Sequence, residues 1–191
     1  MIISISGNQG SGKSTVAKRL AETLGWPRYY IGGMRREAAL KRGLTLAEYN
    51  KLGEIDPSTD LEVDEYQKKL GQTKDNFVIE GRTSWYFIPH SLKIYLDVSD
   101  EEGAKRILLA NRDGEDKYMT TFEDVLASIQ RRRASDDKRY QQLFGINAHD
   151  LNNFDYVIDT TNLNQNEVFS QVYEIIQNEL NKRFSIDKPE I

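Results

Sequence analysis

The sequence predicts an α/β fold, a three-layer α/β/α sandwich around a central parallel sheet of five strands. Short runs rich in β-branched and aromatic residues alternate along the chain with longer segments whose apolar residues recur at helical spacing. The first run opens into a glycine-rich loop and then a helix, which is typical of a parallel sheet. With 191 residues and no internal repeat, the chain is expected to form one domain over 1–191.

The elements are expected in a regular order. The predicted strands cover 2–6, 28–31, 76–80, 92–98 and 154–160, and the predicted helices cover 16–24, 34–40, 44–53, 59–70, 100–112, 122 to about 145, and a last segment from 168 onward. Two or three helices between the second and third strands are more than a crossover requires. Residues about 33–72 are therefore expected to be a helical substrate-binding insert in a core formed by 1–31 and 73–191.

Composition limits the classes of function. The chain has no Cys, two His and a net charge of −4, which argue against disulfides, a protein metal cage and general attraction to nucleic acid. No apolar run is long enough for a membrane span, and we expect no signal peptide and a cytoplasmic enzyme. Charge is uneven: residues 54–65 carry six acids and no Lys or Arg, whereas residues 131–139 are rich in arginine.

The loop after the first strand matches G-x-x-x-x-G-K-S. It comprises Gly7, Asn8, Gln9, Gly10, Ser11, Gly12, Lys13, Ser14 and Thr15. Glycines let successive backbone N–H groups point inward, and the following helix presents its positive end to the same point. We expect this loop to bind a nucleoside triphosphate, with Lys13 at the β- and γ-phosphates and Ser14 on Mg²⁺.

The carboxyl ends of later strands carry further candidates. Glu80 ends an apolar strand and is expected to hold Mg²⁺ through water. Arg36 and Arg82 are candidates for anchoring a second phosphate, because a guanidinium group can bind two phosphate oxygens at once through parallel hydrogen bonds. Arg35, beside Arg36 on the helix, is expected to be solvated.

Arg132, Asp136 and Arg139 share one face of a predicted helix at spacings i, i+4 and i+7. Asp136 can pair with both arginines, which would then clamp a transferring phosphoryl group. A basic face that binds something else, or is only solvated, is the alternative. Arg106 and Arg112 could close on the same site.

Among the six acids of residues 54–65, Asp60 is the one we expect to accept hydrogen bonds from a base amine or a sugar hydroxyl. Nearby aromatic residues are expected mostly in the core, with stacking on a base as the less favoured interpretation. They are Tyr30, Trp85, Tyr86 and Phe87.

These motifs together resemble the nucleoside monophosphate kinases, most closely the cytidylate kinase-like group with short lids. The segments that carry the resemblance are 7–15, 32–39 (G-G-M-R-R-E-A-A), 79–82 (I-E-G-R), 132–140 (R-R-A-S-D-D-K-R-Y) and 155–160 (D-Y-V-I-D-T). The resemblance implies a P-loop kinase fold with a lid at about 112–140. It also implies a monomer that transfers the γ-phosphoryl group of ATP to CMP or dCMP, with acceptor contacts from Arg36 and Arg82.

Two departures leave the base open: Arg35 stands where the group usually has an aromatic residue, and Arg133 where it often has an acid. A P-loop kinase for another small acceptor is an alternative, although paired arginines favour an acceptor that already carries a phosphate. A regulatory nucleotide-binding module that hydrolyses ATP slowly is a second alternative.

Overall fold

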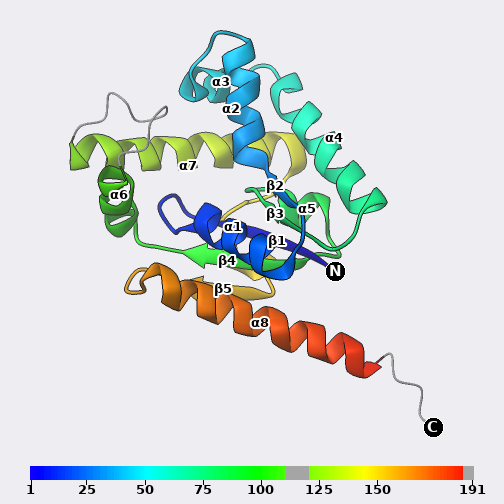
Figure 1. The fold of residues 1–191 in the computed structure, drawn as a ribbon. Helices are drawn as coiled ribbons and strands as arrows, with labels where there is room; N and C mark the ends of the chain where they lie inside the picture. Colours follow the sequence, from blue (N-terminus) through cyan, green and yellow to red (C-terminus); the bar gives the residue numbers. More distant parts are fainter. Residues whose placement is uncertain (111–120, 187–191) are drawn as a thin grey trace.

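A five-stranded sheet forms the centre of the computed structural model, which describes residues 1–110 and 121–186 (Figure 1). Its strands are β1 (Ile2–Gly7), β2 (Arg28–Tyr30), β3 (Phe77–Glu80), β4 (Leu92–Asp97) and β5 (Tyr156–Asp159). They lie in the order β2-β3-β1-β4-β5, and each neighbouring pair is parallel. The predicted strands and their parallel arrangement are therefore confirmed.

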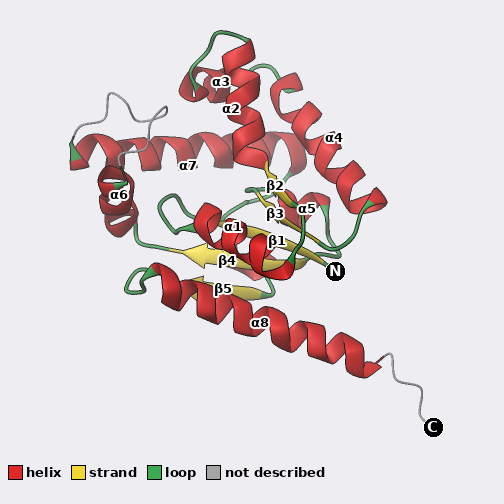
Figure 2. Cartoon of the chain, viewed as in Figure 1, coloured by secondary structure: helices red, strands yellow, loops and turns green. Residues whose placement is uncertain are grey.

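Helices cover both faces of the sheet. The helices α1 (Lys13–Leu24) and α8 (Gln165–Ile186) share a core with β1, β4 and β5, in which Leu20 and Ile176 are fully buried. On the other face, α4 (Ser58–Thr73) and α5 (Ser84–Phe87) pack against β1 and β3 around Phe77 and Ile79. Figure 2 shows the strands between these helical layers, as the three-layer prediction requires.

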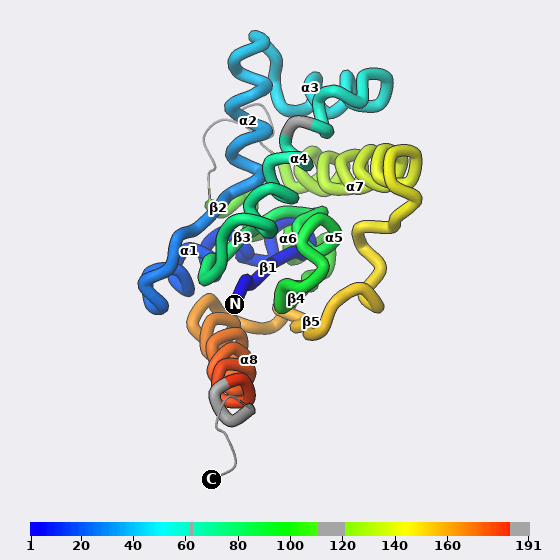
Figure 3. Tube along the Cα trace, turned by 90° about the vertical axis from the view of Figure 1, so that its right-hand side faces the viewer, coloured from blue at the N-terminus to red at the C-terminus, as the bar shows by residue number. Residues whose placement is uncertain are grey.

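The remaining helices gather above the carboxyl ends of the strands. The insert consists of α2 (Ile31–Lys41), α3 (Leu46–Gly53) and α4, and α7 (Phe122–Phe144) passes between α2–α3 and the sheet (Figures 1 and 3). The helix α6 (Asp100–Leu109) packs on α7 through Ile107 and Ile129. A 3-10 helix covers Leu151–Asn153.

The structure differs from the expected elements at a few points. The helix predicted to stop before Gly71 continues to Thr73. Gly71 lies within this helix at a close contact, where a Cβ would lie 2.9 Å from the Ile88 side chain. The helix α5 and the 3-10 helix are too short to show a periodicity in the sequence. Part of the predicted lid, including Arg112, lies outside the described residues.

No helix in the described residues 1–110 and 121–186 is both long enough and apolar enough to span a membrane.

Candidate active site

A cavity of about 120 Å³ lies at the carboxyl ends of β1, β2 and β3. The glycine-rich loop, the insert, the turn after β3 and helices α6 and α7 all contribute to its wall. The predicted site residues that line it are Gln9, Gly10, Lys13, Ser14, Arg36, Asp60, Glu80, Arg82 and Arg132. Segments far apart in the sequence thus meet at one point, as the parallel sheet predicted.

The glycine-rich loop has the backbone of a phosphate cradle. Gly10 and Gly12 have φ angles of 79° and 85°, in the left-handed region that favours glycine, and α1 begins immediately afterwards at Lys13. The Lys13 Nζ donates to the Asn8 carbonyl oxygen at 2.6 Å, which holds the ammonium group against the loop. This region can therefore receive an anion at the start of α1.

Other loop residues support the cradle from outside the cavity. Asn8 donates through Nδ2 to Asp97 Oδ1 at 2.5 Å and accepts from the Tyr95 hydroxyl at 2.7 Å, so its side chain faces β4. Gly7, Ser11, Gly12 and Thr15 also do not line the cavity. Of the predicted loop, the part facing the cavity is formed by Gln9, Gly10, Lys13 and Ser14.

The loop touches α6 directly through backbone. A Cβ on Gly10 would lie 2.5 Å from the Cα and carbonyl oxygen of Gly103, and a Cβ on Gly103 would lie 2.5 Å from the Gln9 carbonyl oxygen. Real Cβ atoms do not approach that closely, so this contact depends on glycine in both elements. The packing fixes the loop against the start of α6.

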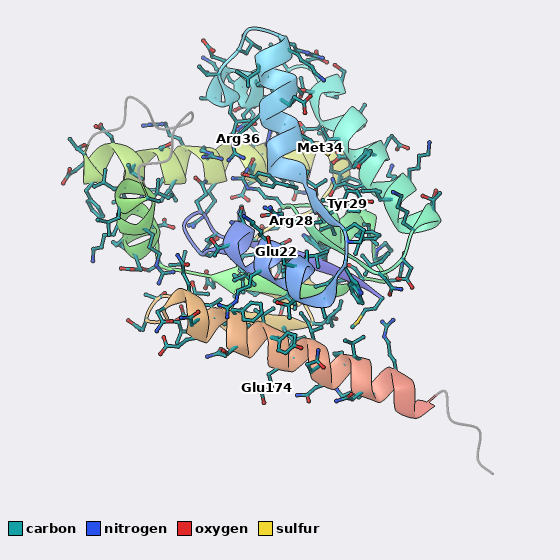
Figure 4. The ribbon with its side chains drawn as sticks, in the orientation of Figure 1. Glu22, Arg28, Tyr29, Met34, Arg36 and Glu174 are labelled. Atoms are coloured by element: carbon teal, nitrogen blue, oxygen red, sulfur yellow. The ribbon has the colours of Figure 1, made fainter. Side chains whose placement is uncertain are left out.

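Two arginines line the cavity from different elements of the fold. Arg36 on α2 donates to the Tyr30 hydroxyl. Arg82, after β3, is 22% exposed, and its Nη1 lies 2.5 Å from Asp136 Oδ2 on α7. In Figure 4, Arg36 extends from α2 and Arg28 lies below it, between α2 and α1.

Glu80 ends β3 beside the glycine-rich loop. It is 2% exposed, and the sheet register places it beside Ile5 of β1 and Tyr30 of β2. Arg28 of β2 donates to Glu80 Oε1 through Nε at 2.6 Å and through Nη2. Sequence reasoning found Glu80 and missed this partner, because β2 and β3 become neighbours only through the sheet order.

A buried chain of ion pairs joins the insert, α7 and the turn after β3. Arg35 pairs with Asp60, and Arg139 lies 3.7 Å from Asp60 and 2.5 Å from Asp136, which also pairs with Arg82. The Arg139 side chain is fully buried and is not among the residues that line the cavity. The predicted pairing of Asp136 with Arg139 is present, and Arg82 is an unexpected second partner.

The prediction that Arg35 is solvated is wrong. Arg35 is 8% exposed, and besides Asp60 it donates to the Asn50 Oδ1 at 3.1 Å. Arg35 is buried because α3 and α4 supply its partners Asn50 and Asp60. The sequence of α2 alone does not show that these helices cover this face. Asp60, proposed from the sequence as a base or sugar ligand, lines the cavity but uses its carboxylate in ion pairs with Arg35 and Arg139.

Asp136 stays ionised despite complete burial. Burial raises the pKa of this carboxyl, but the positive charges of Arg82, Arg139 and Arg132 outweigh burial and lower the pKa below its ordinary value. Asp136 therefore holds a full negative charge between the arginines at neutral pH.

The prediction that Arg106 could close on this site is wrong. Arg106 donates to the carbonyl oxygens of Thr160 at 2.7 Å and Leu163 at 3.2 Å, so it ties α6 to the segment after β5. Arg133 likewise pairs with Asp100 at 2.5 Å and joins α7 to α6. Both residues stabilise the framework around the cavity.

The aromatic residues divide between core and cavity. Trp85 and Phe87 are each 7% exposed, as the core prediction requires, whereas Tyr86 is 38% exposed. Tyr30 lines the cavity beside Arg36.

Sequence reasoning missed Asp64 of α4, which lines the cavity and is 4% exposed. Burial and the negative charge of Asp60 raise the pKa of its carboxyl to about 7. The signal was present in the sequence, because Asp60, Asp64 and Gln67 follow one helix face at i, i+4 and i+7.

Metal binding would depend on the nucleotide. In the described part of the chain, no group of three or more His, Cys, Asp or Glu side chains is placed to hold a metal ion. Ser14 and Glu80 do line the same cavity. One hydroxyl and one carboxylate fit Mg²⁺, which usually keeps several waters and binds proteins together with substrate phosphates.

Comparison with known proteins identifies relatives over most of the chain. The model of the cytidylate kinase-like family matches residues 2–162. A cytidylate kinase from Methanococcoides burtonii is 36% identical over 165 residues, which cover 86% of this chain and 90% of that protein. An S-adenosylmethionine-dependent nucleotide dehydratase from Lacinutrix mariniflava is 36% identical over 176 residues, which cover 92% of this chain but 36% of that longer protein.

Solved structures support the fold. The shikimate kinase from Bacteroides thetaiotaomicron superposes with a TM-score of 0.63 at 14% identity, over 95% of this chain and 98% of that one. At that identity the likeness concerns the fold alone, which is the three-layer P-loop kinase fold. On the match over residues 2–162 and the identity to cytidylate kinases, the chain belongs to the cytidylate kinase-like family.

Proposed function

We propose that the protein transfers the γ-phosphoryl group of ATP to a nucleoside monophosphate, with CMP or dCMP as the acceptor, giving ADP and the nucleoside diphosphate. The observation that carries this proposal is that Lys13 of the phosphate loop lines one cavity with Arg36 and Arg82. Two sets of phosphate-binding groups in one cavity suit a donor and an acceptor that both carry phosphate.

On the donor side, the N–H groups of residues 9–14 and the start of α1 would bind the phosphates of ATP. Lys13 would neutralise charge on the β- and γ-phosphates. Ser14 would ligate Mg²⁺, with Glu80 acting through water, and the ion would supply further charge neutralisation.

On the acceptor side, Arg36 and Arg82 would hold the monophosphate, and Arg132 on α7 would contact the transferring group. No protein base is needed, because a phosphate oxygen is already a competent nucleophile and catalysis consists of positioning and charge stabilisation. The fully buried Arg139 would act by fixing Asp136, and through it Arg82.

Opening and closing follow from the size of the cavity. Its 120 Å³ is below the ~300 Å³ lower range of ligand pockets, so the insert at 33–72 and helix α7 would move apart to admit two nucleotides. Closing again would exclude water and prevent hydrolysis of ATP.

Cytidylate is proposed because the relatives with this name match over most of their length. The fold is shared with shikimate kinases, but the arginine pair favours an acceptor that carries a phosphate.

The test is formation of ADP by purified protein with Mg·ATP and each of CMP, dCMP, UMP, AMP and GMP. CMP or dCMP is expected to give the largest kcat/KM. Lys13→Met is expected to lower kcat about 100- to 1,000-fold, because Lys13 stabilises transferring charge. Lys18→Met is the matched control, since Lys18 is on the same helix and 66% exposed.

The absence of diphosphate with every acceptor would overturn the proposal. ATP hydrolysis that Arg36→Ala leaves unchanged would instead indicate the regulatory module.

A further inference from the structure

The carboxylate of Asp64 is an unusual feature of the cavity wall. It is 4% exposed, and its Oδ2 atom is buried without a hydrogen-bond partner among the described residues. Its Oδ1 atom accepts from Gln67 Nε2 at 3.2 Å. One oxygen of a cavity-lining carboxylate is thus left to accept a hydrogen bond from outside the protein.

The environment holds this carboxylate in position. Gln67 is fully buried, and its Nε2 also lies 3.4 Å from Thr83 Oγ1, while its Oε1 accepts from the Ser84 hydroxyl at 2.7 Å. The turn after β3 therefore fixes Gln67, and Gln67 fixes Asp64. Because both amide hydrogens of Gln67 are used, Asp64 Oδ2 has no second donor from this side chain.

The position fits the nucleoside end of the acceptor. Thr83, which anchors Gln67, directly follows Arg82, one of the two arginines assigned above to the acceptor phosphate. Asp64 itself lies on α4 of the insert, beside Val63, and both line the cavity together with Leu46 of α3. Apolar side chains beside one oriented polar atom are typical of a pocket for a base.

We propose that Asp64 reads the base of the acceptor, with Oδ2 accepting a hydrogen bond from the exocyclic amino group of cytosine. This assignment rests on the function proposed above. Uracil presents a carbonyl oxygen where cytosine has the amino group, so a carboxylate there repels uracil and attracts cytosine. Asp60 does not fill this role, because Arg35 and Arg139 already pair with its carboxylate.

Charged groups around Asp64 make the reading dependent on pH. Burial and Asp60 on the same helix raise the pKa to about 7, against the opposing effects of Arg35 from α2 and Lys68 from α4. Below that pH the protonated carboxyl can donate to the uracil oxygen as well as accept. The ratio of kcat/KM for CMP to that for UMP is therefore expected to rise as the pH increases through about 7.

The principal experiment measures this ratio in the wild type and in Asp64→Asn. The amide can donate to the uracil oxygen, and it accepts from the cytosine amino group without the charge of the carboxylate. The ratio is therefore expected to fall about 10- to 100-fold in the variant, through a lower KM for UMP and a higher KM for CMP. Glu65→Gln is the matched control, because it makes the same carboxylate-to-amide change at the next residue, which is exposed, and it should leave the ratio unchanged. A ratio that is the same in Asp64→Asn and the wild type would overturn the inference.

A second measurement needs no variant. The wild-type ratio is followed over about pH 6 to pH 8, where ionisation of the phosphate cancels because it is common to both acceptors. A ratio that does not change with pH would contradict the assignment even if Asp64→Asn failed to fold.

Failure of the proposed function would be recognised separately. If the wild type phosphorylates no monophosphate, that proposal is wrong, and equilibrium binding of CMP and UMP to the wild type and Asp64→Asn then decides the inference. Preferential binding of CMP that Asp64→Asn abolishes would support base reading, and equal binding of CMP and UMP to the wild type would overturn it.

Discussion

Replacing Asp136 with Asn tests the buried ion pairs that join α7 to the cavity wall. Asp136 is 1% exposed, and its two oxygens each lie 2.5 Å from an arginine: Oδ1 from Arg139 Nη2 and Oδ2 from Arg82 Nη1. Asn has nearly the same shape but keeps one acceptor oxygen. Its NH₂ group would face a guanidinium, and the negative charge between the two arginines would be lost.

The expected cost is large. Removing one partner of a buried ion pair costs about 3–5 kcal/mol, because the remaining charge is buried without compensation. For a chain of this length, 1 kcal/mol shifts the midpoint of thermal unfolding by about 2–4 °C, so Asp136→Asn should lower Tm by about 6–20 °C. The KM for the acceptor should also rise, since Arg82 loses the group that orients it.

The dependence on pH has a definite sign. The pKa of Asp136 is lowered in the folded protein, so its stabilisation is present above the unfolded carboxyl pKa and is lost as the pH falls through the folded value. The difference in Tm between the variant and the wild type, measured by circular dichroism, should therefore be large at neutral pH and smaller in strong acid. Asp137→Asn is the control, since Asp137 is 45% exposed. An Asp136→Asn variant that unfolds at the wild-type temperature would refute this reasoning.

Gly10→Ala should abolish ATP binding, measured by calorimetry, because its Cβ would lie 2.5 Å from the Gly103 backbone. Gly25→Ala carries a similar φ angle of 67° with no atom within 4 Å, so it should lose stability but still bind ATP. Arg106→Ala should lower Tm and leave both KM values unchanged, since Arg106 bonds framework carbonyls; a changed KM for ATP would contradict that placement. Arg36→Ala should raise the KM for the acceptor about 10- to 100-fold with little change for ATP, and an equal rise in both would argue against an acceptor role.

Patterns confined to neighbouring residues predicted most of the fold. The first strand, the glycine-rich loop and the first helix can be predicted from residues 2–24 alone. Each later strand can likewise be predicted from its own short apolar run. The parallel arrangement then brings Glu80 and Arg82 to the same cavity as Lys13, because the strand ends share one edge of the sheet.

Ion-pair partners could not be predicted in the same way. Arg82 and Asp136 lie on different elements, and their contact depends on how α7 crosses the strand ends. Arg35 on α2 is likewise buried because it bonds to Asn50 on α3 and Asp60 on α4. The helical spacing of apolar residues does not predict where α3 and α4 lie relative to α2. The roles of these side chains in catalysis stay predictions.

The buried charges also constrain how the molecule folds. Arg35, Asp60, Arg139, Asp136 and Arg82 alternate in sign along a chain that runs from the insert through α7 to the sheet edge. Docking α7 without the insert would bury a charge whose partner is still in water, at a cost of several kcal/mol. The insert and α7 should therefore dock as one cooperative unit, and their amide hydrogens should exchange together, apart from those of β1 and β4.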